Sequence, residues 1–191
     1  AIHAMDMMRQ QVRPETRIGT WIIAGGTASN VIPPYGELEV TVRHTERDYL
    51  NGLSEQIKKI FEGAALCTGT TVDVEFYGNP YDDMNQNHRG TVLIEEVMAD
   101  MGLDFEPGPA ALGGSSDIGN VSYQCAAFHP KLRLAGDDKV CHSKEFAAAM
   151  LDPTIEQTII DGANIIGRTL LCLVETPDIL QEIVAEFNAT K

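Results

Sequence analysis

A hairpin signature constrains the first part of this sequence more than any other feature. Residues 25–43 read GGTASNVIPPYGELEVTVR, with glycine, asparagine and proline in the first half and alternating apolar and polar residues in the second. Alternation with a period of two is typical of a strand with one buried face. A second strand-like run, rich in isoleucine, precedes the turn at 18–24. The sequence therefore predicts two strands, over 18–24 and 37–43, joined by a long turn.

Helical patterns flank this hairpin. Apolar residues at helical spacing predict helices over 2–12, ended by Pro14, and over 46–66, and a third strand is predicted over 71–77. The order helix, strand, strand, helix, strand predicts an α+β sandwich, in which one antiparallel sheet carries its helices on one face.

The character of the chain changes at GNPYDDMNQN, residues 78–87, which predicts a domain boundary after residue 80. The second domain, 81–191, should contain helices, one buried strand and a long Gly/Ser loop. The expected elements are a helix over 87–101, the loop over 107–120, the strand over 121–128, a helix from Asp152-Pro153 to 174 and a last helix from Thr176-Pro177 to 187.

Charge and composition exclude several classes of partner. The 191 residues carry a net charge of −14, which argues against nucleic acid or an anionic membrane surface. No apolar run approaches the roughly 20 residues that span a bilayer, and residues 1–13 lack the order of a signal peptide. The four cysteines form no CxxC pair, so we expect buried or free thiols instead of disulfides, and a reducing, cytoplasmic location.

The stretch GGSSDIGN has the composition of a ligand-binding loop. Its glycines let backbone N–H groups approach a ligand, and Ser115, Ser116 and Asp117 add two hydroxyls and a carboxylate. No GK[ST] follows, so it is not a nucleotide phosphate loop. The alternative is a solvent-exposed loop without a ligand.

Two histidines lie at junctions that suit a ligand. His142 precedes Ser143, a candidate N-cap of a short helix, and such a junction can hold a metal ligand or a mere capping residue. His129 follows an apolar run and could contact a ligand or pack on the surface. The remaining histidines stand outside any pairing: His3, His44 and His88, the last at a predicted helix start.

Asn30 and Arg43 flank the second predicted strand. An amide and a planar guanidinium together bind a carboxylate or a carbonyl oxygen well. The alternative is structural: Asn30 would stabilise the turn, and Arg43 would pair with an acidic neighbour, namely Glu37, Glu39 or Glu46.

Taken together, these stretches resemble a family of zinc-dependent amidohydrolases and metallopeptidases that includes aminoacylases, aminobenzoyl-glutamate hydrolases and dipeptidases. The resemblance covers nearly the whole chain. Its most specific parts are the NVIP hairpin and the GSSD–GNVS pair, and NPYDDMNQN and CHSKEF follow the family's order.

The resemblance implies a fold and a set of roles. Residues 1–80 would form a ferredoxin-like lid and dimerisation domain, followed by an incomplete α/β zinc-exopeptidase-like catalytic segment. Asn30 and Arg43 would reach into a substrate site, often that of a partner subunit, in a homodimer. The Gly/Ser loop and His129 would line the substrate pocket, and His142 would be the last ligand of a pair of divalent ions, zinc or manganese.

The resemblance also implies that the N-terminal half of the catalytic domain, with the general base and most metal ligands, is absent from this chain. We therefore expect a part of an amidohydrolase or peptidase that is inactive alone. Its parent would cleave an amide next to a carboxylate-bearing group, as in N-acyl-amino acids, aminobenzoyl-glutamate or dipeptides. The second domain should expose an apolar face. The alternative function is a non-catalytic dimerisation or binding module.

Overall fold

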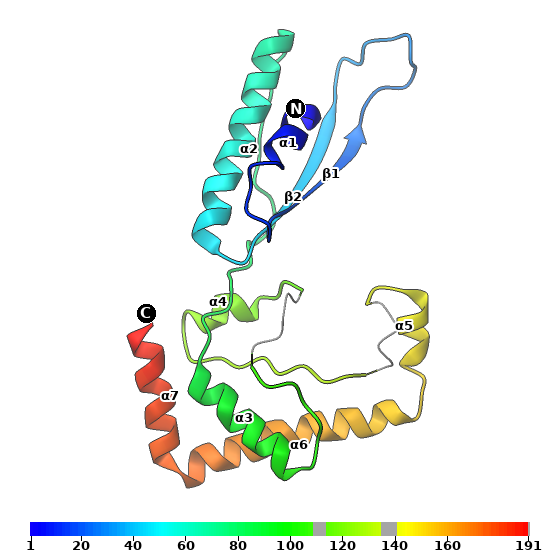
Figure 1. Cartoon of the computed structure of the whole chain (residues 1–191). Coiled ribbons are helices and arrows are strands. Elements are labelled where there is room, and N and C mark those ends of the chain that lie inside the picture. The colour runs from blue at the N-terminus through cyan, green and yellow to red at the C-terminus, as the bar shows by residue number, and fades with distance from the viewer. Residues whose placement is uncertain (109–113, 135–140, 191) are drawn as a thin grey trace. The chain divides into compact units, whose positions relative to one another are not determined.

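The computed structural model describes residues 1–108, 114–134 and 141–190. The chain divides into two compact units, Ala1–Asp83 and Met84–Lys191, and each is described here by itself. The described residues form a mixed α+β structure, with a two-stranded antiparallel sheet in the first unit and most of the helices in the second (Figure 1).

The first unit contains two helices and one hairpin. Its elements are α1 (Ile2–Met8), β1 (Arg17–Ala24), β2 (Glu37–Arg43) and α2 (Arg47–Thr68). The predicted strands and the long helix are confirmed, whereas the first helix ends four residues earlier than predicted. Gly69 ends α2 in the left-handed conformation that favours glycine, with φ of 68°.

Both helices of this unit pack on the sheet. Met5 of α1 and Leu53 and Ile57 of α2 form a buried cluster. Ile18, Val40 and Val42 of the sheet pack against that cluster. These three residues share one face because Ile18 pairs with Val42 and side chains alternate along a strand. The register places Arg17 opposite Arg43 at the base of the hairpin, and Ala24 opposite Glu37 near the turn.

The predicted third strand over 71–77 is wrong. Those residues form no regular element, and Phe76 is largely exposed. The alternation of Val72, Val74 and Phe76 favours an extended chain, but a strand also needs a neighbour with which to form a hydrogen-bonded ladder. The ferredoxin-like arrangement thus stays a prediction.

The regular elements in the described part of the second unit are all helices, joined by irregular segments. Its elements are α3 (His88–Asp100), α4 (Ile118–Ser122), α5 (Lys144–Ala149), α6 (Thr154–Glu175) and α7 (Pro177–Ala189). The helices predicted over 87–101, from 152 and from 176 are confirmed within two residues at each end.

The strand predicted over 121–128 is also wrong. Val121 and Ser122 end α4, and the Val121 carbonyl accepts hydrogen bonds from the N–H groups of Gln124 and Cys125. These bonds turn the chain where a strand would extend it. Phe128 instead packs against a buried cluster of Ile94, Met98 and Ile165.

Side chains cap the start of α3. Asn87 is buried at the N-cap of α3, where its oxygen accepts from the Gly90 N–H at 2.9 Å and its amide donates to the Ile183 carbonyl at 2.9 Å. Glu186 of α7 accepts from the N–H groups of His88 and Arg89 at 2.7 and 2.8 Å. A carboxylate is well placed at a helix N-terminus, so these bonds join α3 to α7.

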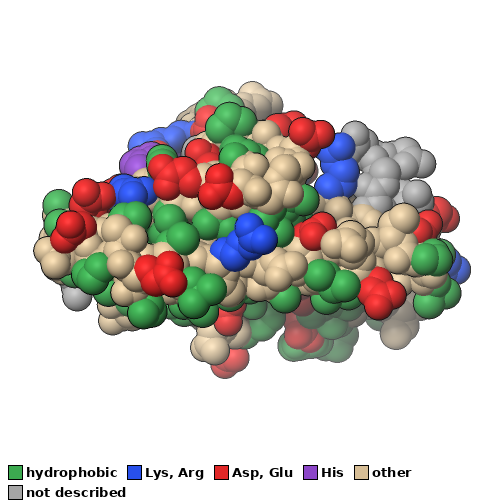
Figure 2. Space-filling model, turned by 90° about the horizontal axis from the view of Figure 1, so that it is seen from below, with side chains coloured by type: hydrophobic (Ala, Val, Ile, Leu, Met, Phe, Trp, Pro, Cys, Tyr) green, Lys and Arg blue, Asp and Glu red, His purple; other side chains and the backbone are tan. Residues whose placement is uncertain are grey.

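Helix α6 has two apolar faces. Ile155, Ile165 and Thr169 are buried, whereas a second stripe of apolar residues is exposed. That stripe consists of Ile159, Ile160, Ile166, Leu170, Leu171 and Val174. Hydrophobic side chains at the surface, set among acidic ones, are also visible in Figure 2. The expected exposure of an apolar face in the second part of the chain is therefore observed.

All four cysteines are free thiols, as predicted. Among the described residues, no helix is both long enough and apolar enough to cross a membrane.

Candidate functional site

Arg43 is the last residue of β2 and lies on the exposed side of the sheet. Its cross-strand neighbour is Arg17. The Arg17 guanidinium turns away to donate to the carbonyls of Pro14 at 2.7 Å and Thr16 at 2.9 Å. Like charges directly opposite each other destabilise a sheet, so the position of Arg43 has no obvious structural benefit.

The acidic neighbours of Arg43 are engaged by other residues. Tyr35 donates its hydroxyl hydrogen bond to Glu37 at 2.9 Å, and Tyr77 donates to Glu39. Arg13 pairs with Glu46 at 2.7 Å.

The predicted alternative, a surface ion pair of Arg43 with one of these three glutamates, is therefore not observed. Within the described ranges, Arg43 makes no hydrogen bond or ion pair, so its guanidinium is open to a ligand.

Asn30 lies in the connection between the strands. The N–H of Val31 bonds weakly to the Ala28 carbonyl at 3.4 Å, which makes Asn30 the third residue of a turn. The surrounding tip is apolar and exposed: Ile32 is 92% exposed. In the part of the chain that the structure describes, the Asn30 side chain has no hydrogen-bond partner, so its amide is open as well.

Asn30 and Arg43 do not meet within one chain. The connection precedes Glu37 at one end of β2, and Arg43 lies at the other end. Six residues of strand span roughly 20 Å at about 3.3 Å per residue. One protomer therefore cannot place both side chains on one carboxylate, although the sequence allowed both to lie near one site.

Ser116 and Asp117 of the Gly/Ser loop bond to each other and to the backbone at the start of α4. Ser116 Oγ lies 3.2 Å from Asp117 Oδ1, and the Asp117 carbonyl accepts from the Val121 N–H at 3.2 Å. Asp117 thus starts α4, and Ser115 is exposed beside it. Residues 109–113 of the predicted loop lie outside the described residues.

The two histidines predicted as ligands are exposed. His129 follows the packed Phe128, and His142 directly precedes Ser143, whose hydroxyl accepts from the Phe146 N–H at 3.0 Å. The predicted cap of the short helix is confirmed. His142 has a φ of 66°, which is uncommon for a residue with a side chain, and it lies in the turn before α5.

The described residues do not form a metal site by themselves. No group of three or more His, Cys, Asp or Glu side chains comes together in these parts of the chain. A zinc site needs at least three protein ligands, so His142 alone does not meet the requirement.

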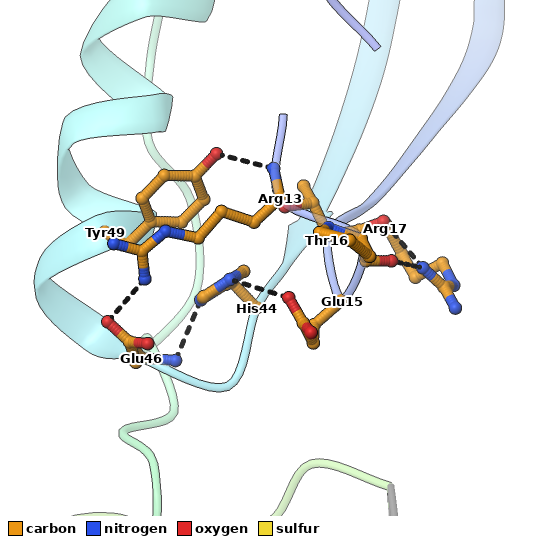
Figure 3. A network of polar contacts seen from close by, with 8 residues as sticks. Arg13, Glu15, Thr16, Arg17, His44, Glu46 and Tyr49 are labelled. Atoms are coloured by element: carbon orange, nitrogen blue, oxygen red, sulfur yellow. Dashed lines mark hydrogen bonds and ion pairs between the residues drawn. The ribbon is translucent and has the colours of Figure 1, made fainter. Parts of the chain in front are cut away.

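Sequence reasoning missed His44, which follows Arg43. Its side chain is 1% exposed. Its ring lies 4.3 Å from that of Tyr49, and its Nδ1 accepts from the Glu46 N–H at 2.9 Å. Figure 3 shows this ring within a polar network at the base of the first unit. The available signal was position: a histidine two residues before a helix N-cap can bond to the backbone there.

A shallow groove of about 460 Å³ lies between α1 and α2. Met8, Val12 and Leu53 supply apolar walls, and polar residues such as Asp48 line it as well. None of the predicted site residues lines this groove.

Comparison with known proteins shows hydrolase relatives. A Xaa-Arg dipeptidase from Mus musculus is 29% identical over 187 residues, which cover 96% of this chain and 43% of that protein. The Xaa-Arg dipeptidase from Homo sapiens is 26% identical over 98% of this chain and 44% of that protein. An N-acetyldiaminopimelate deacetylase from Leuconostoc citreum is 31% identical over 84% of this chain and 40% of that protein. No family model matches the chain.

These relatives confirm the resemblance seen in the motifs: the chain is similar to hydrolases named as dipeptidases and a deacetylase. The chain spans less than half the length of the relatives it matches.

Proposed function

We propose that this chain is part of a metal-dependent hydrolase that cleaves an amide bond next to a carboxylate-bearing group. The observation that carries the proposal is the unpaired Arg43 guanidinium on the exposed side of the sheet. A guanidinium binds a carboxylate through two parallel hydrogen bonds. The names of the relatives support this substrate class, since a Xaa-Arg dipeptidase acts on a dipeptide.

Two copies of the chain would complete the substrate site. Asn30 and Arg43 lie at opposite ends of β2, so one substrate can contact both only if they come from different protomers. Each strand of the two-stranded sheet has a free edge in the described structure, and free edges favour pairing. Trp21 and Ile32, both exposed, supply apolar surface on the hairpin for such a homodimer.

In the second unit, His142 is proposed as one ligand of a divalent metal, zinc or manganese. The other ligands would come from outside the described residues, and we propose that this chain alone does not hydrolyse amides. Ser115, Ser116, Asp117 and His129 would line the substrate pocket. The exposed stripe of α6 would pack against another part of the hydrolase, because an apolar surface of that kind is unfavourable in water.

Calorimetric titration with a matched pair of ligands tests the proposal. The ligands are a Xaa-Arg dipeptide such as alanyl-arginine and the same dipeptide with an amidated C-terminus. We expect the free carboxylate to bind more tightly, and Arg43→Gln to abolish the difference. Arg9→Gln is the control, since Arg9 is a surface arginine paired with Asp6. Equal binding of both ligands to the unaltered chain would contradict the proposal.

The alternative is a non-catalytic dimerisation or binding module of the same family. Both functions predict carboxylate binding, but only the hydrolase predicts turnover when the missing ligands are supplied. Hydrolysis by this chain alone that survives His142→Ala would contradict the assignment of His142.

A further inference from the structure

His44 joins three segments of the first unit. Its side chain is 1% exposed and 4.0 Å from Glu15 in the segment before β1. Its ring packs on Tyr49 of α2, and its Nδ1 accepts from the backbone N–H of Glu46, the N-cap residue of α2. The ring therefore fixes the connection by which β2 enters α2.

The hydrogen bond at Nδ1 indicates where the proton of the ring lies. Nδ1 accepts from an N–H group, so it carries a lone pair and no proton. The proton of the neutral ring is then on Nε2. That nitrogen is buried and makes no hydrogen bond among the described residues, because the Glu15 carboxylate stays 4.0 Å away.

We propose that His44 is a neutral positioning residue whose protonation releases the β2–α2 connection. Its bond to the N–H two residues ahead has the form of an Asx turn, in which an asparagine or aspartate oxygen accepts that bond. A charged imidazole carries a proton on both nitrogens, so it cannot accept from Glu46. Acid therefore replaces a hydrogen bond with two N–H groups that face each other.

The charged groups around His44 do not offset this loss. Glu15 would pair with a charged Nε2, but its side chain is 47% exposed, and solvent weakens such pairs. The Glu46 carboxylate already binds Arg13 at 2.7 Å. The Arg13 guanidinium lies over the Tyr49 ring at 4.4 Å, so it adds a positive charge to the same cluster (Figure 3).

Because His44 is next to Arg43, its protonation should also affect ligand binding. His44 follows Arg43, so the bond to Glu46 also fixes the backbone from which the Arg43 side chain extends. Acid release of this connection should loosen Arg43 and weaken its hold on a carboxylate. This last step rests on the proposed function, whereas the state of the His44 ring does not.

Nitrogen NMR of the imidazole ring provides the first test. Long-range proton–nitrogen correlations at neutral pH should show His44 as the Nε2-protonated form. On acidification, the Glu46 amide should lose its protection from hydrogen exchange. A His44 ring protonated on Nδ1 at neutral pH would overturn the proposal.

His44→Asn is the decisive variant, because asparagine can accept the same bond but cannot take up a proton. We expect its Glu46 amide to stay protected in acid. His142→Asn, which alters an exposed histidine of the other unit, should respond to acid as the unaltered chain does. An equal loss of protection in His44→Asn and the unaltered chain would overturn the proposal.

The proposed effect of His44 on Arg43 is tested separately, by measuring carboxylate binding. At neutral pH, His44→Ala should bind the dipeptide carboxylate more weakly, and His44→Asn should restore the binding. If the unaltered chain binds no carboxylate at all, the proposed function fails while the NMR results on His44 still stand or fall independently. If carboxylate binding is the same in all three proteins, the positioning role is overturned.

Discussion

Arg43 pairs with Arg17 directly across the β1–β2 ladder, so two arginines occupy opposite positions at the base of the hairpin. Arg17 bonds to two backbone carbonyls, whereas Arg43 has no partner among the described residues. An unpaired charge kept at a position where it destabilises the sheet is a typical feature of a binding residue.

Because Arg43 and Arg17 lie opposite each other, we predict that Arg43→Gln stabilises the fold while it abolishes carboxylate binding. Loss of the like-charge pair should raise the free energy of unfolding by about 0.2–1 kcal/mol, measured by urea denaturation. Arg9→Gln removes the pair with Asp6 and should give no such gain. A loss of stability in Arg43→Gln would indicate a structural role for this arginine.

The contact between α3 and Phe128 predicts a strong effect of Gly90→Ala. A Cβ at Gly90 would lie 1.7 Å from a ring carbon of Phe128, so the ring must move. We expect a loss of about 1–3 kcal/mol in the free energy of unfolding. Gly167→Ala in α6 is the control, because its Cβ would meet nothing within 4 Å, and the change should be neutral or stabilising.

Ile165 and Ile166 are adjacent in the sequence but lie on different faces of α6, so they form a matched pair for substitution. Ile165 is 2% exposed and Ile166 is 62% exposed. Ile165→Ala should lower the free energy of unfolding by about 2–5 kcal/mol, whereas Ile166→Ala should change it by about 0.5 kcal/mol or less. Ile166→Glu should also reduce binding of an apolar dye. Equal losses for both alanine variants would show that the second face is covered in solution.

Tyr35 provides a prediction about pH. Its hydrogen bond to Glu37 raises the pKa of the hydroxyl above its ordinary value. A raised folded-state pKa stabilises the fold below the pKa of the unfolded chain, and this contribution is lost as the pH rises through the folded-state value. Glu37→Gln should bring the pKa of Tyr35 down in an NMR titration. Tyr77, held by Glu39, should keep its raised pKa in that variant.

Sequence patterns predicted the hairpin and most helices because these elements are determined by residues within or next to them. The alternation in ELEVTVR and the turn residues before it were sufficient to place β2, and Thr176-Pro177 marked the start of α7. The segment 71–77 has the same alternation as β2, but pairing depends on a partner that the segment's own sequence does not specify.

The candidate site was predictable only in part. The residue types at Asn30 and Arg43 pointed to carboxylate binding, but the roughly 20 Å between them depends on strand register, which the sequence did not reveal. His44 was overlooked because its burial arises from Tyr49 and Glu15, which pack on it from other segments.

The central claim is that this chain supplies substrate-binding residues to a metal-dependent hydrolase whose metal site it does not complete. Elemental analysis for zinc and manganese, after dialysis against trace metal, tests it most directly. We predict close to zero metal ions per chain, since no three potential ligands come together in the described residues. A tightly held pair of ions per chain, lost in His142→Ala, would contradict the claim and show that this chain contains a complete metal centre.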